Sequence, residues 1–282
     1  MLDKKLINSP LFNASLSTIF WAIQIFVAKL GLNAGADAVL FNFQSSVFAL
    51  LLLSIYGLFA GVWPVLKTLS KRTLAVLIGA NAIVMVFGGL FFNAGAKLTT
   101  AINVGFLTQF TTVATVLIAW VLLRERIDLP KAVTVFMLLA GTFLLVTEGR
   151  LIVPHIGDIF ILISCVAWST ANVLIRKSLK NTEVPPDAAT LLRPIVGLPI
   201  AFTLIMFANI YPEPLRTFFD VNIFSPDYLG YAAINGFMLT LQWIFINKSL
   251  KVSSASYASI LLAVARPKKS FGSLKPYHSS SS

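Results

Sequence analysis

This chain of 282 residues has few charged residues, one cysteine and two histidines. Only 12% of its residues are Asp, Glu, Lys or Arg, whereas about a quarter are in an average soluble domain. The single cysteine, Cys165, excludes an intrachain disulfide, and its apolar neighbours indicate a buried thiol. Hydrophobic residues make up 57% of the chain, which is more apolar side chain than a water-exposed surface could hide. The composition therefore predicts an integral membrane protein.

Acidic residues are absent from the middle of every long apolar run. The 11 Asp and Glu residues lie in loops or at the ends of runs, and His155 and His278 lie in a loop and in the C-terminal tail. The sequence also lacks the spacing of a metal site, a Ser/His/Asp triad or a phosphate-binding loop. We therefore expect no cofactor, no membrane-embedded enzyme and no proton relay of the kind that intramembrane carboxylates provide.

Eight apolar runs are long enough to cross a bilayer as helices. A hydrocarbon core of about 30 Å needs about 20 helical residues, and backbone polar groups in lipid must be paired internally. Uninterrupted runs of this length predict helices, because barrel strands are shorter and alternate in polarity. The runs cover residues 11–30, 38–59, 74–96, 101–123, 132–147, 157–175, 188–211 and 228–250. The predicted fold class is an all-α integral membrane protein.

Lysine and arginine are distributed unequally between the two sides of the predicted membrane. The side of the N-terminus carries Lys4, Lys5, Lys67, Lys71, Arg72, Arg124, Arg126, Lys131, Arg176, Lys177, Lys180, Lys248 and Lys251. The other side carries Lys29, Lys97, Arg150 and Arg216. Because cytoplasmic loops hold the excess of Lys and Arg, we expect a cytoplasmic N-terminus in a plasma or inner membrane. The formal charge of +11 is then a topology signal, and no nucleic-acid partner is expected.

Residues of the first half recur in the second half in the same order. The pairs are Ser17, Trp21 and Lys29 with Ser164, Trp168 and Arg176; Gln44 with Arg193; and Phe92, Asn93 and 97–101 with Ile246, Asn247 and 251–255. This order indicates an ancient duplication of a five-helix unit. Since five is odd, the second copy enters the membrane inverted, an arrangement typical of secondary transporters.

Three further stretches form a recognisable set. They are residues 122–126 before an apolar helix ending at Ala140 and Gly141, Gly157 and Asp158 before a run that reaches Trp168, and residues 251–259. In this order and spacing they resemble the EamA family of the drug/metabolite transporter superfamily. The resemblance covers residues 11 to 265. It implies ten helices in two inverted five-helix repeats around a central cavity, with a first repeat at 1–148 and a second at 155–265.

Together, the repeat and the resemblance predict a secondary transporter of small organic metabolites, such as amino acids, that works by alternating access. The expected partners are the metabolite and the lipid bilayer, and a homodimer is one arrangement that the sequence allows. The chain departs from the family pattern after Ala265, because 255–265 is too short to span and 266–282 is a basic, serine-rich tail. We therefore expect an incomplete second repeat and about eight full spans. The alternative function is a transport-incompetent membrane protein with only an assembly or structural role.

Arg193 is the ionisable residue that lies deepest inside an apolar run, on the order of 10 Å from the start of its helix. One interpretation is an anchor for an anion, because the planar guanidinium suits a carboxylate. The alternative is a snorkelling or interhelical arginine with a structural role.

Further candidates for lining a substrate pathway are polar or aromatic residues inside the predicted spans. Tryptophan usually marks the membrane interface, so an internal one can line a cavity. Amide side chains hydrogen-bond across helices or face a water-filled path. These candidates are Trp21, Gln24, Gln44, Asn81, Asn93, Gln109, Trp168, Asn172, Asn235, Gln242 and Trp243. Ordinary helix packing is the alternative for each of them.

Overall fold

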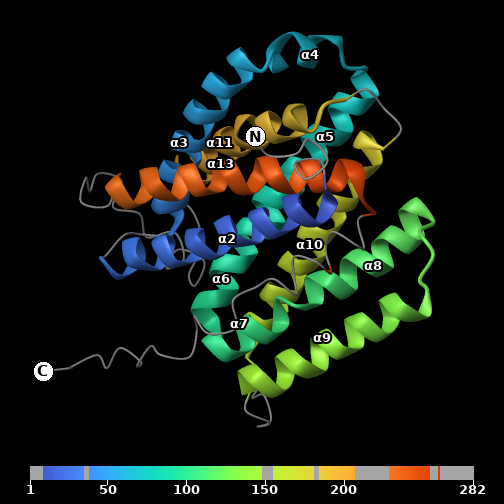
Figure 1. Cartoon of the computed structure of the whole chain (residues 1–282). Coiled ribbons are helices and arrows are strands. Elements are labelled where there is room, and N and C mark those ends of the chain that lie inside the picture. Colours follow the sequence, from blue (N-terminus) through green and yellow to red (C-terminus); the bar gives the residue numbers. More distant parts are fainter. Residues whose placement is uncertain are drawn as a thin grey trace, which may run out of the picture.

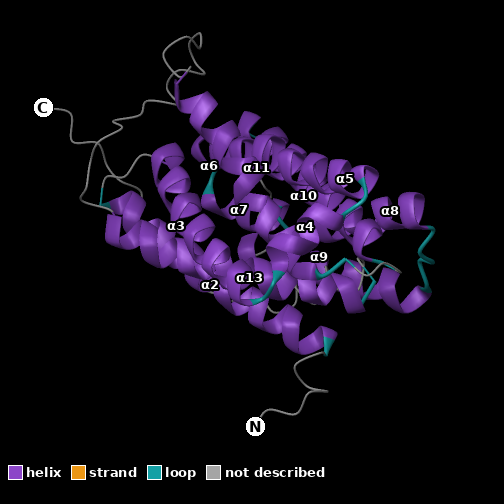
Figure 2. Cartoon of the chain, turned by 90° about the horizontal axis from the view of Figure 1, so that it is seen from above, coloured by secondary structure: helices purple, strands orange, loops and turns teal. Residues whose placement is uncertain are grey.

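The computed structural model of the chain describes residues 9–34, 38–147, 155–180, 184–206, 229–254 and 260. Within these ranges the chain forms helices and no strand (Figure 2). The helices are α2 (Pro10–Asn33), α3 (Ala38–Phe59), α4 (Val62–Thr68), α5 (Lys71–Ile83), η1 (Val84–Leu90), α6 (Phe91–Leu98), α7 (Ala101–Leu107), α8 (Phe110–Leu123), α9 (Leu129–Thr147), α10 (Ile156–Leu179), α11 (Pro186–Met206) and α13 (Leu229–Val252). The predicted short ninth segment and the tail lie outside the described residues, apart from residue 260.

All eight predicted spans are helical where the structure describes them. Within the described ranges, six segments are long and apolar enough to cross a membrane: Pro10–Ala28, Phe41–Phe59, Lys71–Gly89, Asn103–Leu123, Ile156–Leu179 and Leu229–Val252. The other two predicted spans are α9, whose apolar part is shorter, and α11, which carries Asp187 and Arg193. The prediction of an all-helical membrane fold is confirmed.

Two of the predicted helices are interrupted, which the hydrophobic pattern did not show. The run 74–96 contains the π-helix η1 between α5 and α6, and the run 101–123 breaks at Thr108 and Gln109 between α7 and α8. Gly88 in η1 faces the indole of Trp168, so closely that a Cβ atom there would lie 2.4 Å from its Nε1 atom. A wide turn of this kind commonly lies where another group packs into a helix.

Helices that are distant in the sequence pack against one another (Figure 1). Helix α13 lies along α2 and also contacts α3, while α10 lies along α5, η1, α6 and α8. Helix α11 packs against α3 and α5. The contact between α13 and α3 is close because Gly236 lies against the backbone of Ser45, where a Cβ atom would come within 2.5 Å of the carbonyl oxygen.

The core and the outer surface are both apolar. Buried aliphatic side chains from α3, α5, α10, α11 and α13 form the main cluster, which includes Leu53, Leu77, Ile175, Leu191 and Leu250. Large apolar side chains also cover the outside, and Phe59, Leu129 and Phe136 are 90%, 77% and 69% exposed. Lipid chains can cover such a surface, whereas water could not do so without a large free-energy cost.

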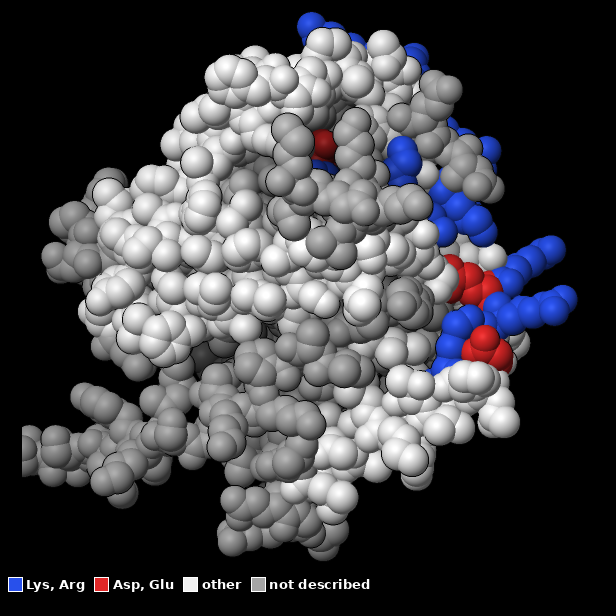
Figure 3. All heavy atoms as spheres, viewed as in Figure 1, with Lys and Arg blue, Asp and Glu red and all other residues white. Residues whose placement is uncertain are grey.

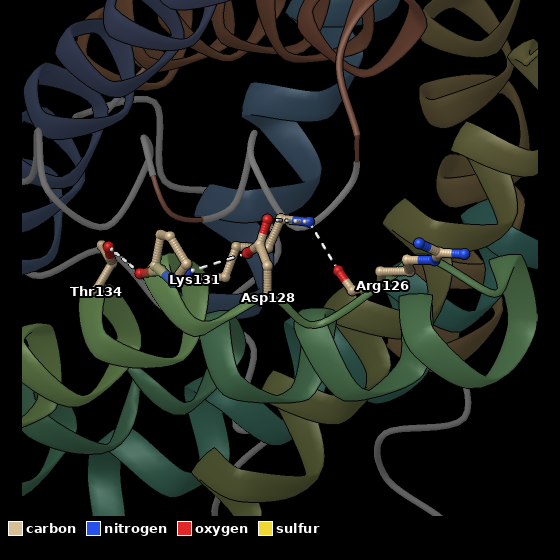
Figure 4. A network of polar contacts seen from close by, with 5 residues as sticks. Arg126, Asp128, Lys131 and Thr134 are labelled. Atoms are coloured by element: carbon tan, nitrogen blue, oxygen red, sulfur yellow. Dashed lines mark hydrogen bonds and ion pairs between the residues drawn. The ribbon is translucent and has the colours of Figure 1, made fainter.

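Basic side chains gather on one side of the molecule (Figure 3). The exposed ones belong to loops and helix ends that the sequence analysis placed on a single membrane side: Lys67, Lys71, Arg72, Arg124, Arg126, Lys177 and Lys180. Figure 4 shows a polar network between the loop that joins α8 to α9 and the start of α9. In it, the Lys131 ammonium donates to the Arg126 carbonyl at 2.8 Å, and Asp128 accepts from the Lys131 backbone N–H at 3.2 Å. Asp128 thus caps the start of α9.

Candidate functional site

Arg193 brings three of the predicted candidates together. Its side chain is 8% exposed and lies where α11 meets α5 and α13. The Nε atom donates to Oδ1 of Asn81 at 3.3 Å, and the guanidinium carbon lies 5.4 Å from the ring centroid of Trp243. The three residues come from three helices, so only the packing of those helices forms the group. We call Asn81, Arg193 and Trp243 the arginine cluster.

Asn81 is held so that its carbonyl oxygen can face Arg193. Its Nδ2 atom donates to the Leu77 carbonyl one turn earlier in α5, at 2.9 Å. The oxygen and the nitrogen of its side-chain amide are therefore both hydrogen-bonded within the protein, and its side chain is 1% exposed. The amide thus orients one edge of the guanidinium and leaves the other edge unoccupied.

A second polar layer lies one helical turn from the cluster. The Nδ2 atom of Asn247 donates to the Thr190 hydroxyl at 2.8 Å, and that hydroxyl lies 3.3 Å from the Trp243 carbonyl, which can accept its proton. Thr190 and Asn247 were absent from the candidates. Helical spacing could have found them, because Thr190 precedes Arg193 by three residues and Asn247 follows Trp243 by four.

The arginine cluster is a positive region with unused hydrogen-bonding capacity. The Nη2 atom of Arg193 is buried and has no hydrogen-bond partner, and Oδ1 of Asn247 is also buried without one. The ion pair of Lys131 with Asp128 lies away from this site, and no carboxylate among the described residues pairs with Arg193. Burying an unpaired ion costs several kcal/mol, of which the contact with the Trp243 ring offsets up to about 2 kcal/mol. An anion at the free edge would remove most of that cost.

A further polar contact joins α3 to α13. The Nδ2 atom of Asn235 donates to the Ser45 hydroxyl at 2.9 Å, and both residues are buried. The neighbouring Gln44 is half-buried, and its Oε1 atom has no hydrogen-bond partner. The candidates Gln44 and Asn235 therefore lie on α3 and α13, which both pack against α2 and α11.

The remaining candidates lie elsewhere in the bundle. Trp168 is half-buried in α10, with its ring centroid 5.1 Å from that of Phe92. Gln109 is buried at the break between α7 and α8, and its Oε1 atom is unpaired. The others are Trp21 and Gln24, half-buried in α2; Asn172, half-buried in α10; Gln242, half-buried in α13; and Asn93, in α6 with a side chain outside the description.

No candidate metal centre is present in the described part of the chain, where no three His, Cys, Asp or Glu side chains come close enough to hold an ion. The carboxylate with the most partners is Asp158, in the first turn of α10. It accepts from the Thr99 hydroxyl, from Nδ2 of Asn103 at 2.9 Å and from the His155 backbone N–H at 2.9 Å. Asp158 therefore ties the start of α10 to the turn between α6 and α7.

Comparisons with known proteins agree with this architecture. The family model for the EamA-like transporter family matches residues 8–147 and 155–265. The uncharacterized transporter YyaM of Bacillus subtilis (strain 168) is 22% identical over 197 residues, which cover 68% of this chain and 62% of the relative. The chain thus spans less than two thirds of that relative's length.

A solved crystal structure shares the fold, with a TM-score of 0.66 and 19% sequence identity over 91% of this chain and 84% of the other. At that identity the likeness concerns the fold alone. The family match, by contrast, extends over nearly the whole chain and over all the described helices. This multi-pass membrane protein therefore belongs to the EamA-like transporter family.

Proposed function

We propose that this chain carries small organic metabolites, such as amino acids, across a plasma or inner membrane by alternating access. The proposal treats 1–148 and 155–265 as two inverted repeats, with the N-terminus in the cytoplasm. Family membership and the similarity to a protein named as a transporter support it. The observation that carries it is the reciprocal packing of helices from one repeat against helices of the other.

The first helix of each repeat packs along the third helix of the other. In the first repeat, α2 lies along α13; in the second, α10 lies along α5, η1 and α6. The second helices, α3 and α11, pack against each other. This reciprocal pattern fits two halves related by a pseudo-two-fold axis in the membrane plane, which can open to either side by exchanging their conformations.

Hydrogen bonds hold α10 at both of its ends, to the first repeat at its start and to α13 of its own repeat at its other end. At its start, Asp158 accepts from Thr99 in the α6–α7 turn and from Asn103 in the first turn of α7. At its other end, Nη1 of Arg176 donates to the Lys251 carbonyl at 3.0 Å, near the end of α13. In alternating access, the connection between the repeats at Asp158 would open while the one within the second repeat at Arg176 holds. Both consist of a few hydrogen bonds that can break and form again.

The proposed substrate path runs past the arginine cluster and the candidates around it. Arg193, Asn81 and Trp243 would contact the metabolite, with Gln44, Asn235 and the half-buried tryptophans Trp21 and Trp168 along the path. Gln24, Asn93, Gln109, Asn172 and Gln242 complete the proposed lining. We propose no role for nucleic acid, and a homodimer is compatible with the apolar outer surface.

Counterflow in liposomes tests the proposal. The full chain is reconstituted, the vesicles are loaded with one unlabelled amino acid or other metabolite at high concentration, and uptake of the labelled form is followed. A carrier gives a transient accumulation of label above equilibrium, since exchange is faster than loss of the gradient. Vesicles without protein are the control. If no solute in a broad panel gives this overshoot, or if label only equilibrates, the carrier proposal is wrong.

A further inference from the structure

Arg193 is a buried cation whose counter-charge is not found among the described residues. The four described carboxylates are engaged elsewhere or lie at the surface: Asp158 at the α6–α7 turn, Asp128 and Glu125 at the α8–α9 loop, and Asp187 in hydrogen-bond contact with Tyr56. Asp187 is six residues before Arg193, which places it on a different face of α11. A buried charge that no described side chain neutralises indicates a ligand that does.

The free part of the guanidinium has a defined shape. Nε donates to Asn81 and the guanidinium carbon lies over the Trp243 ring, so the unpaired Nη2 belongs to the remaining outer edge of the group. The edge of a guanidinium offers two parallel N–H groups, which match the two oxygens of a carboxylate. A ligand bound there needs a planar anionic end rather than only a negative charge.

The surroundings match a single negative charge. Asn81, Thr190, Trp243 and Asn247 are all neutral, and within the described residues no second Lys or Arg contacts the cluster. A phosphate monoester carries a charge of about −1.5 to −2 near pH 7, and one cation would leave part of it unpaired in a dry site. A monocarboxylate is neutralised in full.

We propose that Arg193 binds the carboxylate of the transported molecule, so that the substrates are small organic monocarboxylates. The inference rests on the proposed carrier function and names its substrate class. Arg193 supplies the positive charge and the pair of parallel N–H donors. Asn81 sets the orientation of these donors, and the ring of Trp243 supports the guanidinium while the site is empty.

Binding to matched acids and amides tests the inference. The full chain in lipid nanodiscs is titrated with acetate, isovalerate, 3-phenylpropionate and L-leucine, each compared with its amide, and the shift in thermal unfolding is recorded. At least one acid should raise the unfolding temperature, and its amide should not. The same acid should bind Arg193→Gln at least tenfold more weakly than the unchanged chain. The affinity of Arg193→Lys should lie between these two, because lysine keeps the positive charge and lacks the pair of parallel N–H donors.

Lys177→Gln is the matched control, because it removes one positive charge from an exposed position on α10. It should bind the acid as the unchanged chain does. If Arg193→Gln does not fold, Arg193→Lys and Trp243→Phe provide the comparison, and both should weaken acid binding. The inference is overturned if acid and amide bind alike, if the folded Arg193 variants bind the acid with unchanged affinity, or if no acid binds the folded chain.

The liposome assay separates this inference from the carrier function. If neutral solutes show counterflow and carboxylates do not, the carrier function stands and the role of Arg193 is wrong. If an acid binds at Arg193 and no solute shows counterflow, the binding site stands and the carrier function is wrong. Counterflow of an acid that disappears in Arg193→Gln and persists in Lys177→Gln supports both.

Discussion

Gly88 and Trp168 pack in direct contact across two helices, and a Cβ atom on Gly88 would lie 2.4 Å from Nε1 of the indole and 2.5 Å from its Cδ1. Gly88 lies in the π-helix η1, and Trp168 lies in the middle of α10. The absence of a side chain at residue 88 is thus what allows α10 to pack this closely on η1.

Gly88→Ala should therefore destabilise the protein, because the methyl group must displace a large ring that also contacts Phe92. Overpacking of this kind costs about 1–3 kcal/mol, which thermal unfolding in detergent can detect. Gly79→Ala is the control, since a Cβ atom there meets nothing within 4 Å, and alanine favours a helix by about 1 kcal/mol over glycine. An equal effect of the two changes would contradict the packing argument.

Asp158→Asn should weaken the connection between α10 and the α6–α7 turn. One carboxylate oxygen becomes an N–H donor, and it then faces the donor groups of Asn103, Thr99 or His155. We expect a loss of about 1–3 kcal/mol in the free energy of unfolding. Asp128→Asn should change it by less than about 0.5 kcal/mol, because Asn caps a helix as well as Asp does and the ion pair with Lys131 is exposed. Similar losses in both variants would show that Asp158 has only a capping role.

The two ends of α10 should lie on opposite sides of the membrane. His155 and Lys180 flank this helix and are both exposed, while the native Cys165 is 1% exposed and should give little background. With the N-terminus in the cytoplasm, Lys180→Cys should resist a membrane-impermeant thiol reagent applied to intact cells, and His155→Cys should react. The opposite labelling would reverse the proposed orientation.

Transport should proceed by exchange or facilitated diffusion and should not depend on a proton gradient. In the described spans the carboxylates Asp158 and Asp187 lie in the first turns of their helices, with none deeper. A proton-coupled carrier usually has a titratable group inside the membrane. An imposed pH gradient across reconstituted vesicles should then leave accumulation of label near equilibration. Concentrative uptake that a protonophore abolishes would contradict this expectation and would direct attention to Asp158 and Asp187.

The sequence predicted the helices, but it did not predict the π-helix η1, the break between α7 and α8, or the contacts of the arginine cluster. Nothing in the apolar run 74–96 distinguishes the π-helix from a regular one, because η1 differs by how residues 84–90 pack, not by their polarity. In the same way, Asn81 and Asn172 are both neutral amides inside apolar runs. Helix packing brings Asn81 to Arg193 and leaves Asn172 half-buried elsewhere on α10.

By itself, the sequence determined the features that depend on neighbouring residues alone: the helical class, the position of the spans, and the gathering of the basic loops on one side of the molecule. Run length and charge act locally through the bilayer, so they can be read along the chain. Only the tertiary structure decided that Arg193 would meet Asn81 and Trp243, which lie in different helices. Contacts between helices depend on which faces pack together and how closely glycines such as Gly88 and Gly236 let them approach, and no local property of the chain specifies that.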